Sequence, residues 1–278
     1  MHPMVNIALA AARKAGEIIA RAADRIDLIE VSRKASNDFV TEIDRAAERE
    51  IIFQLRKAYP DHQILAEESG PSGDDTRSGG FRWIIDPLDG TTNFVRGIPH
   101  FAVSIACARD GRLEHAVIVD PIRREEFTAT RGAGAQLNGR RMRVSTRAGL
   151  KEAVLGTGIP FREPAIEYLP AYLRTLEQFT TRSAGIRRAG AATLDLAYVA
   201  AGRLDGFWEI GLQPWDIAAG ALLVQEAGGL VSDFDGGNDW MDSGRIVAAN
   251  PKCLKAMLQV IRPALGSEAR AAATAADG

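Results

Sequence analysis

The chain has 278 residues, of which 46% are hydrophobic and 25% are charged, and this composition excludes a disordered, collagenous or coiled-coil protein. Its 34 Lys and Arg residues nearly balance its 36 Asp and Glu residues, giving a net charge of -2, which argues against bulk electrostatic binding of nucleic acid. The two cysteines, Cys107 and Cys253, are too few for a disulfide scaffold or a multi-cysteine zinc site and fit a reducing cytosol.

The first predicted element is an amphipathic helix, because apolar side chains recur at helical spacing from Val5 to Ile19. The charges of Arg13, Lys14 and Glu17 interrupt this segment too early for the core of a signal peptide. No stretch of the chain approaches the roughly 18 uncharged apolar residues of a membrane-spanning helix. We therefore expect a cytoplasmic protein without a membrane segment.

The rest of the first half is predicted to contain one more helix and several short strands. Helical spacing predicts a helix from about 44 to 58, ended by Pro60 and Asp61. The glycine-rich stretch 70–80 has the composition of a flexible loop. Apolar runs bounded by turn residues predict strands at 63–66, 83–85, 103–108, 116–119 and 125–130. The last four strands are expected to form an antiparallel meander.

Strands and helices alternate after about residue 149. Strands are predicted at 154–157, 207–210, 230–232 and 246–249. Helices are predicted at 164–179, 191–201, 214–227 and from the Asn250-Pro251 cap to about 265, with Pro170 kinking or splitting the first. The pattern predicts an α+β to α/β protein with an N-terminal domain over 1–148, a C-terminal domain over 149–266 and a disordered tail over 267–278.

The strongest chemical signal is the stretch WIIDPLDGTTN at 83–93. A buried strand leads into a turn that carries two carboxylates, Asp86 and Asp89, and Gly90 then precedes what looks like the start of a helix. Carboxylates are the ligands that Mg²⁺ prefers, and unpaired N–H groups at a helix start suit phosphate oxygens. The combination suggests metal-assisted phosphoryl chemistry. The alternative is a structural turn in which Asp89 caps a helix.

Two more acidic residues are candidates for the same site: Glu67 at the end of a short strand, and Asp216 near the start of the helix after Pro214. Each has an ordinary alternative, a solvated loop edge for Glu67 and a favourable position in the helix dipole for Asp216. Together with Asp86 and Asp89 they would form a cage of four carboxylates. Because such groups repel one another unless cations lie between them, the cage predicts more than one bound metal ion.

Several polar residues could act beside this cage. The ordinary alternative for Asp44 is a helix cap, and its functional role requires that it reach Thr91, where the pair could orient a water. Glu209 lies in an apolar strand and could accept hydrogen bonds from substrate hydroxyls if it faces the cage. The pair Arg187-Arg188 could hold an anion, although a solvated arginine pair is commoner.

The sequence lacks the motifs and residue spacings of several other enzyme classes. The chain contains no Walker A motif and no G-x-S-x-G elbow, and 132–134 lacks the third glycine of a dinucleotide fingerprint and instead predicts a hairpin turn. The four histidines show no close metal-ligand pair. A phosphatase with a nucleophilic aspartate would have its two aspartates two residues apart, whereas Asp86 and Asp89 are three apart, so that class is a minor alternative.

The chain resembles the inositol monophosphatase family over nearly its whole length. The resemblance rests on DFVTEID at 38–44, EES at 67–69, DPLDGTTN at 86–93 and WDIAAGALLVQEAGG at 215–229, in that order, and it is strongest to the bacterial branch. It implies a layered αβαβα sandwich of the metal-dependent sugar phosphatase type, usually a homodimer, which requires two or three Mg²⁺ ions and is inhibited by Li⁺.

The resemblance also implies roles for individual residues. The metal ligands would be Glu67, Asp86, Asp89, Asp216 and the Leu88 carbonyl. Phosphate would be held by the N–H groups of Gly90 and Thr91, and Asp44 with Thr91 would position the attacking water. The substrate-binding positions as a whole would be Glu67, Leu88, Asp89, Gly90, Thr91, Arg187, Ala192, Glu209 and Asp216.

Two functions follow from the family as expectations. The first is hydrolysis of myo-inositol monophosphate, or a similar small phosphorylated polyol, by a metal-activated water. The second is a protein-binding role in transcription antitermination and ribosomal RNA processing with RNA polymerase and Nus factors, as implied by the bacterial branch. A weaker third option is a related phosphatase that acts on a nucleotide bisphosphate or fructose bisphosphate.

Overall fold

The computed structural model describes residues 1–23, 25, 31–35, 38–74, 79–161 and 163–266, with the backbone alone described at 31–35 and 38–41. The tail predicted to be disordered, 267–278, lies outside these residues. In the described part of the chain, no helix is both long and apolar enough to cross a membrane.

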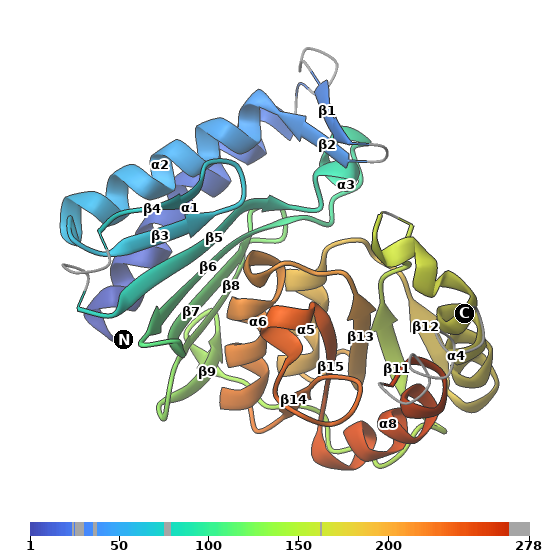
Figure 1. The fold of residues 1–278 in the computed structure, drawn as a ribbon. Helices are drawn as coiled ribbons and strands as arrows, with labels where there is room; N and C mark the ends of the chain where they lie inside the picture. Colours follow the sequence, from blue (N-terminus) through green and yellow to red (C-terminus); the bar gives the residue numbers. More distant parts are fainter. Residues whose placement is uncertain (24, 26–30, 36–37, 75–78, 162, 267–278) are drawn as a thin grey trace.

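Two sheets alternate with three helical layers (Figure 1). The first sheet has eight strands in the order β10-β9-β8-β7-β6-β5-β3-β4. Its strands are β3 (Gln63–Ala66), β4 (Gly70–Ser72), β5 (Phe81–Asp89), β6 (Ala102–Arg109), β7 (Arg112–Asp120), β8 (Glu125–Thr130), β9 (Gly134–Leu137) and β10 (Arg140–Arg141). Strands β5 to β9 pair antiparallel in sequence order, which confirms the predicted meander, and β3 pairs parallel to β5.

The helices α1 (Pro3–Ala23) and α2 (Glu42–Ala58) cover the outer face of the first sheet. Successive side chains of a strand point to opposite faces. On β5, Trp83 and Ile85 accordingly pack in the cluster that contains the two helices, whereas Ile84 packs on the other face. The hairpin β1 (Val31–Ala35) and β2 (Asp38–Thr41) lies between α1 and α2 in the sequence.

The central helical layer consists of α5 (Ala192–Ala200) and α6 (Pro214–Glu226), which lie between the two sheets (Figure 1). Every residue of α6 from 217 to 224 is buried. A helix that is apolar all round needs cover on all sides. Apolar side chains from both sheets cover α6 in one hydrophobic cluster, including Ile84 from the first sheet and Phe207 from the second.

The second sheet has five strands in the order β12-β11-β13-β15-β14. Its strands are β11 (Val154–Thr157), β12 (Gly185–Arg187), β13 (Gly206–Ile210), β14 (Leu230–Ser232) and β15 (Arg245–Ala249). On its outer face, Trp208 and Val247 pack with residues of α4 (Leu169–Arg182) and α8 (Pro251–Leu265). The order of layers is therefore helix, sheet, helix, sheet, helix, which confirms the predicted αβαβα sandwich.

Most predicted elements are present, with two informative details. The stretch 70–80 was expected to be a flexible loop, but Gly70–Ser72 pairs antiparallel with β3 as the edge strand β4. Pro170 does split the predicted helix 164–179, because a 3₁₀ turn at Ala165–Tyr168 precedes α4 and the proline occupies the first turn of α4, where its missing N–H costs nothing. The division into domains at about residue 148 stays a prediction.

Two further helices in the described part of the chain are short. Helix α3 (Thr91–Val95) follows β5 directly, and α7 (Trp240–Ser243) precedes β15. The predicted cap of the last helix is confirmed, since the Asn250 side chain accepts hydrogen bonds from the N–H groups of Lys252 and Cys253 at 3.1 and 3.0 Å.

Candidate metal centre

A bulge at the end of β5 brings Asp86 and Asp89 to one side of the sheet. Asp86 pairs with Ser104 and Asp89 with Ala102, so β5 has one more residue than β6 in this interval. In a regular strand, residues three apart point to opposite faces, and one extra residue reverses that parity. Pro87 lies inside the bulge, where its missing N–H breaks no ladder bond.

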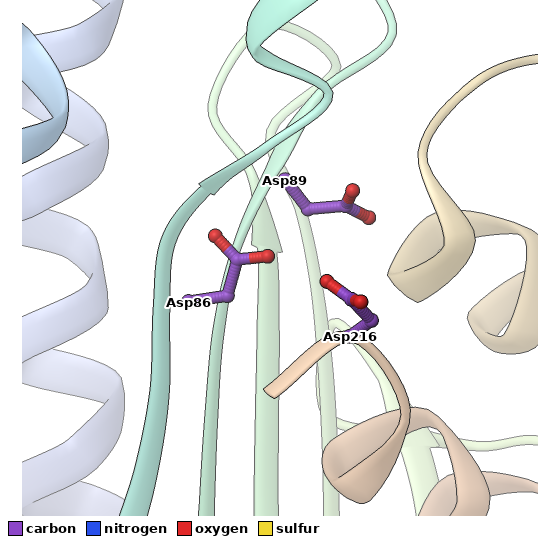
Figure 2. Close-up of side chains that lie close together, drawn as sticks. All are labelled: Asp86, Asp89 and Asp216. Atoms are coloured by element: carbon purple, nitrogen blue, oxygen red, sulfur yellow. The ribbon is translucent and has the colours of Figure 1, made fainter. Parts of the chain in front are cut away.

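Asp216 approaches the same point from the first turn of α6. Its Oδ2 accepts a hydrogen bond from the Gln213 N–H at 2.7 Å, which closes a capping box and orients the carboxylate. Asp86, Asp89 and Asp216 each offer one carboxylate oxygen, and these oxygens all lie within 4.8 Å of one another. Figure 2 shows the three side chains pointing toward a common centre.

Glu67 follows the neighbouring strand β3 directly. The backbone N–H of Glu67 donates to the Ile85 carbonyl at 3.1 Å, and the next N–H, of Glu68, donates to Oε2 of Glu48 at 2.8 Å. The negative charge of the Glu67 carboxylate acts on Asp86 and raises its pKa. Glu67 is therefore coupled electrostatically to Asp86, whereas the group of carboxylate oxygens within 4.8 Å of one another consists of Asp86, Asp89 and Asp216.

The charges of these groups act strongly on one another. Burial, followed by the negative charges of Glu67, Asp89 and Asp216, raises the pKa of Asp86 well above its usual range. Burial and then the charge of Asp89 likewise raise the pKa of Asp216, against the opposing hydrogen bond from Gln213. A cluster of hard oxygen donors whose mutual repulsion is this strong fits a divalent cation.

Thr91 and Asp44 form the predicted pair beside the cluster. Asp44 lies in the first turn of α2 with only 1% of its surface exposed, and Thr91 is the first residue of α3. The Thr91 hydroxyl lies 3.1 Å from Asp44 Oδ1 and 3.1 Å from the Leu88 carbonyl oxygen. The hydroxyl has one hydrogen, which these two acceptors share. If the Leu88 carbonyl no longer accepted this hydrogen, the hydroxyl would donate to Asp44 alone.

Gly90 joins the strand to α3 in a backbone conformation that a larger residue would strain. Its φ is +90°, and a Cβ atom there would lie 3.0 Å from the His100 carbonyl oxygen and 3.3 Å from the Ala191 Cβ. The glycine therefore permits a close approach between the metal-ligand turn and the segment before α5.

Three of the predicted substrate residues, Arg187, Ala192 and Glu209, lie on the second sheet and the central helix α5. Glu209 is half-buried on β13, and its negative charge contributes to the raised pKa of Asp216. Ala192 is the buried first residue of α5. Arg187 is exposed at the end of β12, where its guanidinium donates to the Ile186 carbonyl at 3.1 Å. The substrate role of all three stays a prediction.

Three residues near the cluster were not predicted from the sequence. Thr193 donates two hydrogen bonds to Asp89. Asp195 is buried on α5, and burial followed by the charge of Asp89 raises its pKa well above the usual range. Glu48 is 3% exposed and orients the turn after Glu67. Of these three residues, only Glu48 could have been found from the sequence pattern. It lies on the buried side of α2 together with Asp44, Ile51 and Leu55.

The chain is similar to known proteins over almost its entire length. The family model described as the inositol monophosphatase family matches residues 1–265. A protein of Pseudomonas aeruginosa named Nus factor SuhB is 61% identical over 265 residues, which are 95% of this chain and 98% of that protein. The Nus factor SuhB of Escherichia coli K12 is 56% identical over 266 residues, again 95% and 98% of the two chains.

Solved structures show the same similarity. The extragenic suppressor protein SuhB from Bartonella henselae has a TM-score of 0.90 and 46% identity, covering 94% of this chain and 99% of that one. An inositol monophosphatase from Anabaena has a TM-score of 0.80 and 34% identity, covering 96% and 98%.

Proposed function

Because the chain belongs to the inositol monophosphatase family, we propose that it is a Mg²⁺-dependent phosphomonoesterase that hydrolyses myo-inositol monophosphate and similar small phosphorylated polyols. The observation that carries the proposal is the convergence of Asp86, Asp89 and Asp216, whose ligand oxygens lie within 4.8 Å of one another. The third option, a phosphatase for another small phosphate, shares this chemistry and differs only in substrate.

The proposed Mg²⁺ ligands are the side chains of Glu67, Asp86, Asp89 and Asp216 and the backbone carbonyl of Leu88. Carboxylate and carbonyl oxygens are the donors that this hard cation prefers. Bound there in two or three copies, Mg²⁺ would supply Lewis-acid chemistry, which strengthens water as a nucleophile and offsets negative charge on the phosphate and the departing oxygen.

Asp44 and Thr91 would orient the attacking water. The Thr91 hydroxyl lies 3.1 Å from Asp44 Oδ1, and when it donates to that carboxylate its own lone pairs are left to accept a hydrogen from water. The N–H groups of Gly90 and Thr91 would bind phosphate oxygens. No residue is proposed as a covalent nucleophile, so the reaction is a direct in-line displacement by water.

The remaining proposed contacts select the alcohol part of the substrate. Glu209 would accept hydrogen bonds from substrate hydroxyls, while Ala192 and Arg187 would line the same side. The position of Glu209 is supported by its electrostatic effect on Asp216. A carboxylate at this place favours a hydroxyl-rich substrate over an apolar one, because hydroxyl groups can donate to it, whereas an apolar group would only displace water from it.

A phosphate-release assay on the purified chain tests the proposal. The substrates are myo-inositol monophosphate, sugar monophosphates, fructose bisphosphate and adenosine bisphosphate, each with Mg²⁺ and with excess chelator. We expect Mg²⁺-dependent release that is fastest with myo-inositol monophosphate. Faster release from another phosphate compound would change only the proposed substrate. No phosphate release from any of these substrates in the presence of Mg²⁺ would overturn the proposal.

Metal removal should affect stability in a way that depends on pH. The pKa values of Asp86 and Asp216 in the fold lie above their unfolded values, so the folded chain binds more protons than the unfolded chain. The stability from these groups is complete below about pH 3.9 and is lost as the pH rises through their folded pKa values. We therefore expect Mg²⁺ to raise the melting temperature more at about pH 8 than at about pH 5.

The Asp216→Asn variant provides the comparison for that measurement. It removes one of the repelling charges, so the metal-free variant should melt at a higher temperature than the metal-free wild type at about pH 8. The rise in melting temperature that Mg²⁺ causes should be smaller in the variant than in the wild type. Scanning fluorimetry with and without chelator measures both quantities. Equal Mg²⁺ gains in the two proteins would contradict the assignment of Asp216 as a ligand.

We propose a second function because the relatives at 61% and 56% identity bear the name Nus factor. In this role the chain would act with RNA polymerase and Nus factors in transcription antitermination and ribosomal RNA processing. A folded Asp89→Asn variant, expressed in a strain that lacks the wild-type chain, separates the two functions. Rescue would show that catalysis is dispensable for the cellular role, and failure would leave the enzyme function as the explanation.

We also propose homodimer formation, inhibition by Li⁺ and a cytoplasmic location, which are what the resemblance to the family implies. Sedimentation velocity measures the first and the phosphate-release assay with added Li⁺ measures the second. Cell fractionation measures the third.

A further inference from the structure

The first turn of α5 contacts a metal-ligand candidate directly. The backbone N–H and the hydroxyl of Thr193 both donate to Oδ2 of Asp89, at 2.8 and 2.5 Å, although the two residues are 104 positions apart in the chain. Hydrogen bonds to an ionised acceptor are shorter and stronger than neutral ones. Two donors on one oxygen restrict the rotation of the whole Asp89 carboxylate.

Burial strengthens this contact. Thr193 has 0% of its surface exposed, so water does not compete for its hydroxyl. Thr193 is the second residue of α5, so the helix has no preceding turn whose carbonyl could accept its hydroxyl. Both its N–H and its hydroxyl are directed to the Asp89 carboxylate, which lies on another element.

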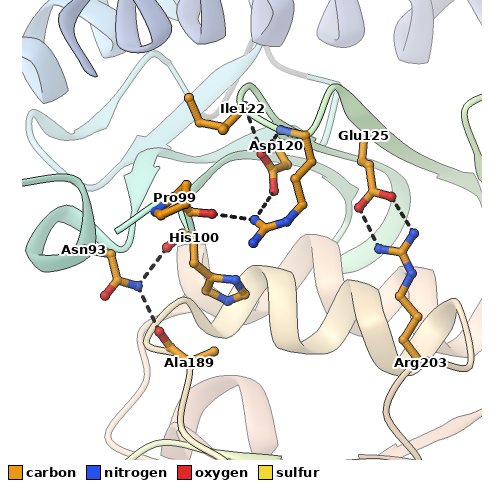
Figure 3. A network of polar contacts seen from close by, with 9 residues as sticks. Asn93, Pro99, His100, Asp120, Ile122, Glu125, Ala189 and Arg203 are labelled. Atoms are coloured by element: carbon orange, nitrogen blue, oxygen red, sulfur yellow. Dashed lines mark hydrogen bonds and ion pairs between the residues drawn. The ribbon is translucent and has the colours of Figure 1, made fainter. Parts of the chain in front are cut away.

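A second set of contacts holds the same two segments together. The Asn93 side chain donates to the Ala189 carbonyl at 2.9 Å and to the His100 carbonyl at 2.8 Å, and Figure 3 shows this amide between the two segments. Gly90 approaches Ala191 so closely that a Cβ atom would lie 3.3 Å from the Ala191 Cβ. The segment before α5 is thus fixed against the turn that carries Asp89.

We infer that Thr193 is a positioning residue that orients the Asp89 carboxylate for the cation, so that the second half of the chain sets the geometry of a ligand from the first half. This inference rests on the proposed function. Groups that hydrogen-bond to a metal ligand fix its orientation, and their loss typically weakens metal affinity by about 10–100-fold.

Three full-length variants test the role of the hydroxyl. Thr193→Val removes it while keeping the branched shape and the backbone N–H, and Thr193→Ser keeps it. Thr175→Val is the matched control, because Thr175 is also 0% exposed but its hydroxyl bonds the Tyr172 carbonyl within α4. Titration calorimetry with Mg²⁺ alone measures affinity without substrate, and thermal melting measures stability.

We expect Thr193→Val to bind Mg²⁺ about 10–100-fold more weakly than the wild type, and Thr193→Ser and Thr175→Val to stay close to it. In the phosphate-release assay, the Mg²⁺ concentration for half-maximal rate should rise in Thr193→Val, while kcat at saturating Mg²⁺ changes little. If Thr193→Val melts too low for titration, Thr193→Ala takes its place.

The outcomes distinguish this inference from the proposed function. A wild type that neither binds Mg²⁺ nor releases phosphate overturns both. A wild type that does both, with unchanged Mg²⁺ affinity in Thr193→Val, overturns the positioning role alone. Equal weakening in Thr193→Val and Thr193→Ser would also overturn it, since the hydroxyl would not be the cause.

Discussion

Replacing Asp86 by Asn is expected to lower the rate of Mg²⁺-dependent phosphate release by roughly a thousand-fold or more. Asp86 is 1% exposed and lies among three other carboxylates. Asn has no charge to offer a cation, and its amide hydrogens would occupy part of the same centre. Loss of several kcal/mol of metal-assisted stabilisation of the transition state corresponds to a rate loss of about this size.

The same substitution should leave the fold intact. Burial and the neighbouring carboxylates make the charge of Asp86 unfavourable in the metal-free protein, so the neutral Asn relieves repulsion. We therefore expect the metal-free variant to melt at or above the wild-type temperature while its activity is lost. Asp110→Asn is the matched control, because Asp110 lies in an exposed turn with φ +50°, a conformation that Asn also tolerates.

Both quantities are measured on the same purified samples, at saturating Mg²⁺ for the rate. Near-normal turnover by Asp86→Asn would reject Asp86 as a metal ligand. A loss of activity accompanied by a large fall in melting temperature would also contradict the prediction, because it would trace the effect to folding and not to the missing charge.

The elements of this fold were largely predictable because their signals are local. The strands 125–130 and 154–157 have the predicted bounds, since apolar runs between turn residues depend on few neighbours. Strand β4 was missed because its glycine-rich composition is that of a loop. Its pairing depends on β3, which offers an open edge only once the sheet has formed.

The candidate site likewise depends partly on local sequence and partly on contacts between segments that are far apart in the chain. The type and spacing of Asp86 and Asp89 predict cation ligands, but their approach from one side requires the bulge against β6. The contact of Thr193 with Asp89 joins positions 104 apart. No local pattern marks a threonine in an apolar helix as the donor to a carboxylate, so only the fold assigns it.

Removing the Thr91 hydroxyl with Thr91→Val is expected to lower kcat by about 100- to 1,000-fold while Mg²⁺ affinity changes little. Correct orientation of an attacking group contributes effects of this size or more. The hydroxyl lies 3.1 Å from both Asp44 Oδ1 and the Leu88 carbonyl. Valine keeps the branched shape and the backbone N–H, so phosphate contacts through the backbone should survive.

Asp44→Asn should cost about as much as Thr91→Val, because Asp44 acts on the water only through the Thr91 hydroxyl. Residues that act as a unit give losses that do not add. The double variant should therefore be about as slow as either single variant. Stopped-flow or steady-state phosphate release at saturating Mg²⁺ and substrate gives the three kcat values, and titration calorimetry confirms that the metal still binds.

Additive losses in the double variant would show that Asp44 and Thr91 act independently, which contradicts the orienting pair. A large fall in Mg²⁺ affinity in Asp44→Asn would instead make Asp44 part of the metal centre. The structure favours the pair, because Asp44 Oδ1 accepts a hydrogen bond from the Thr91 hydroxyl at 3.1 Å.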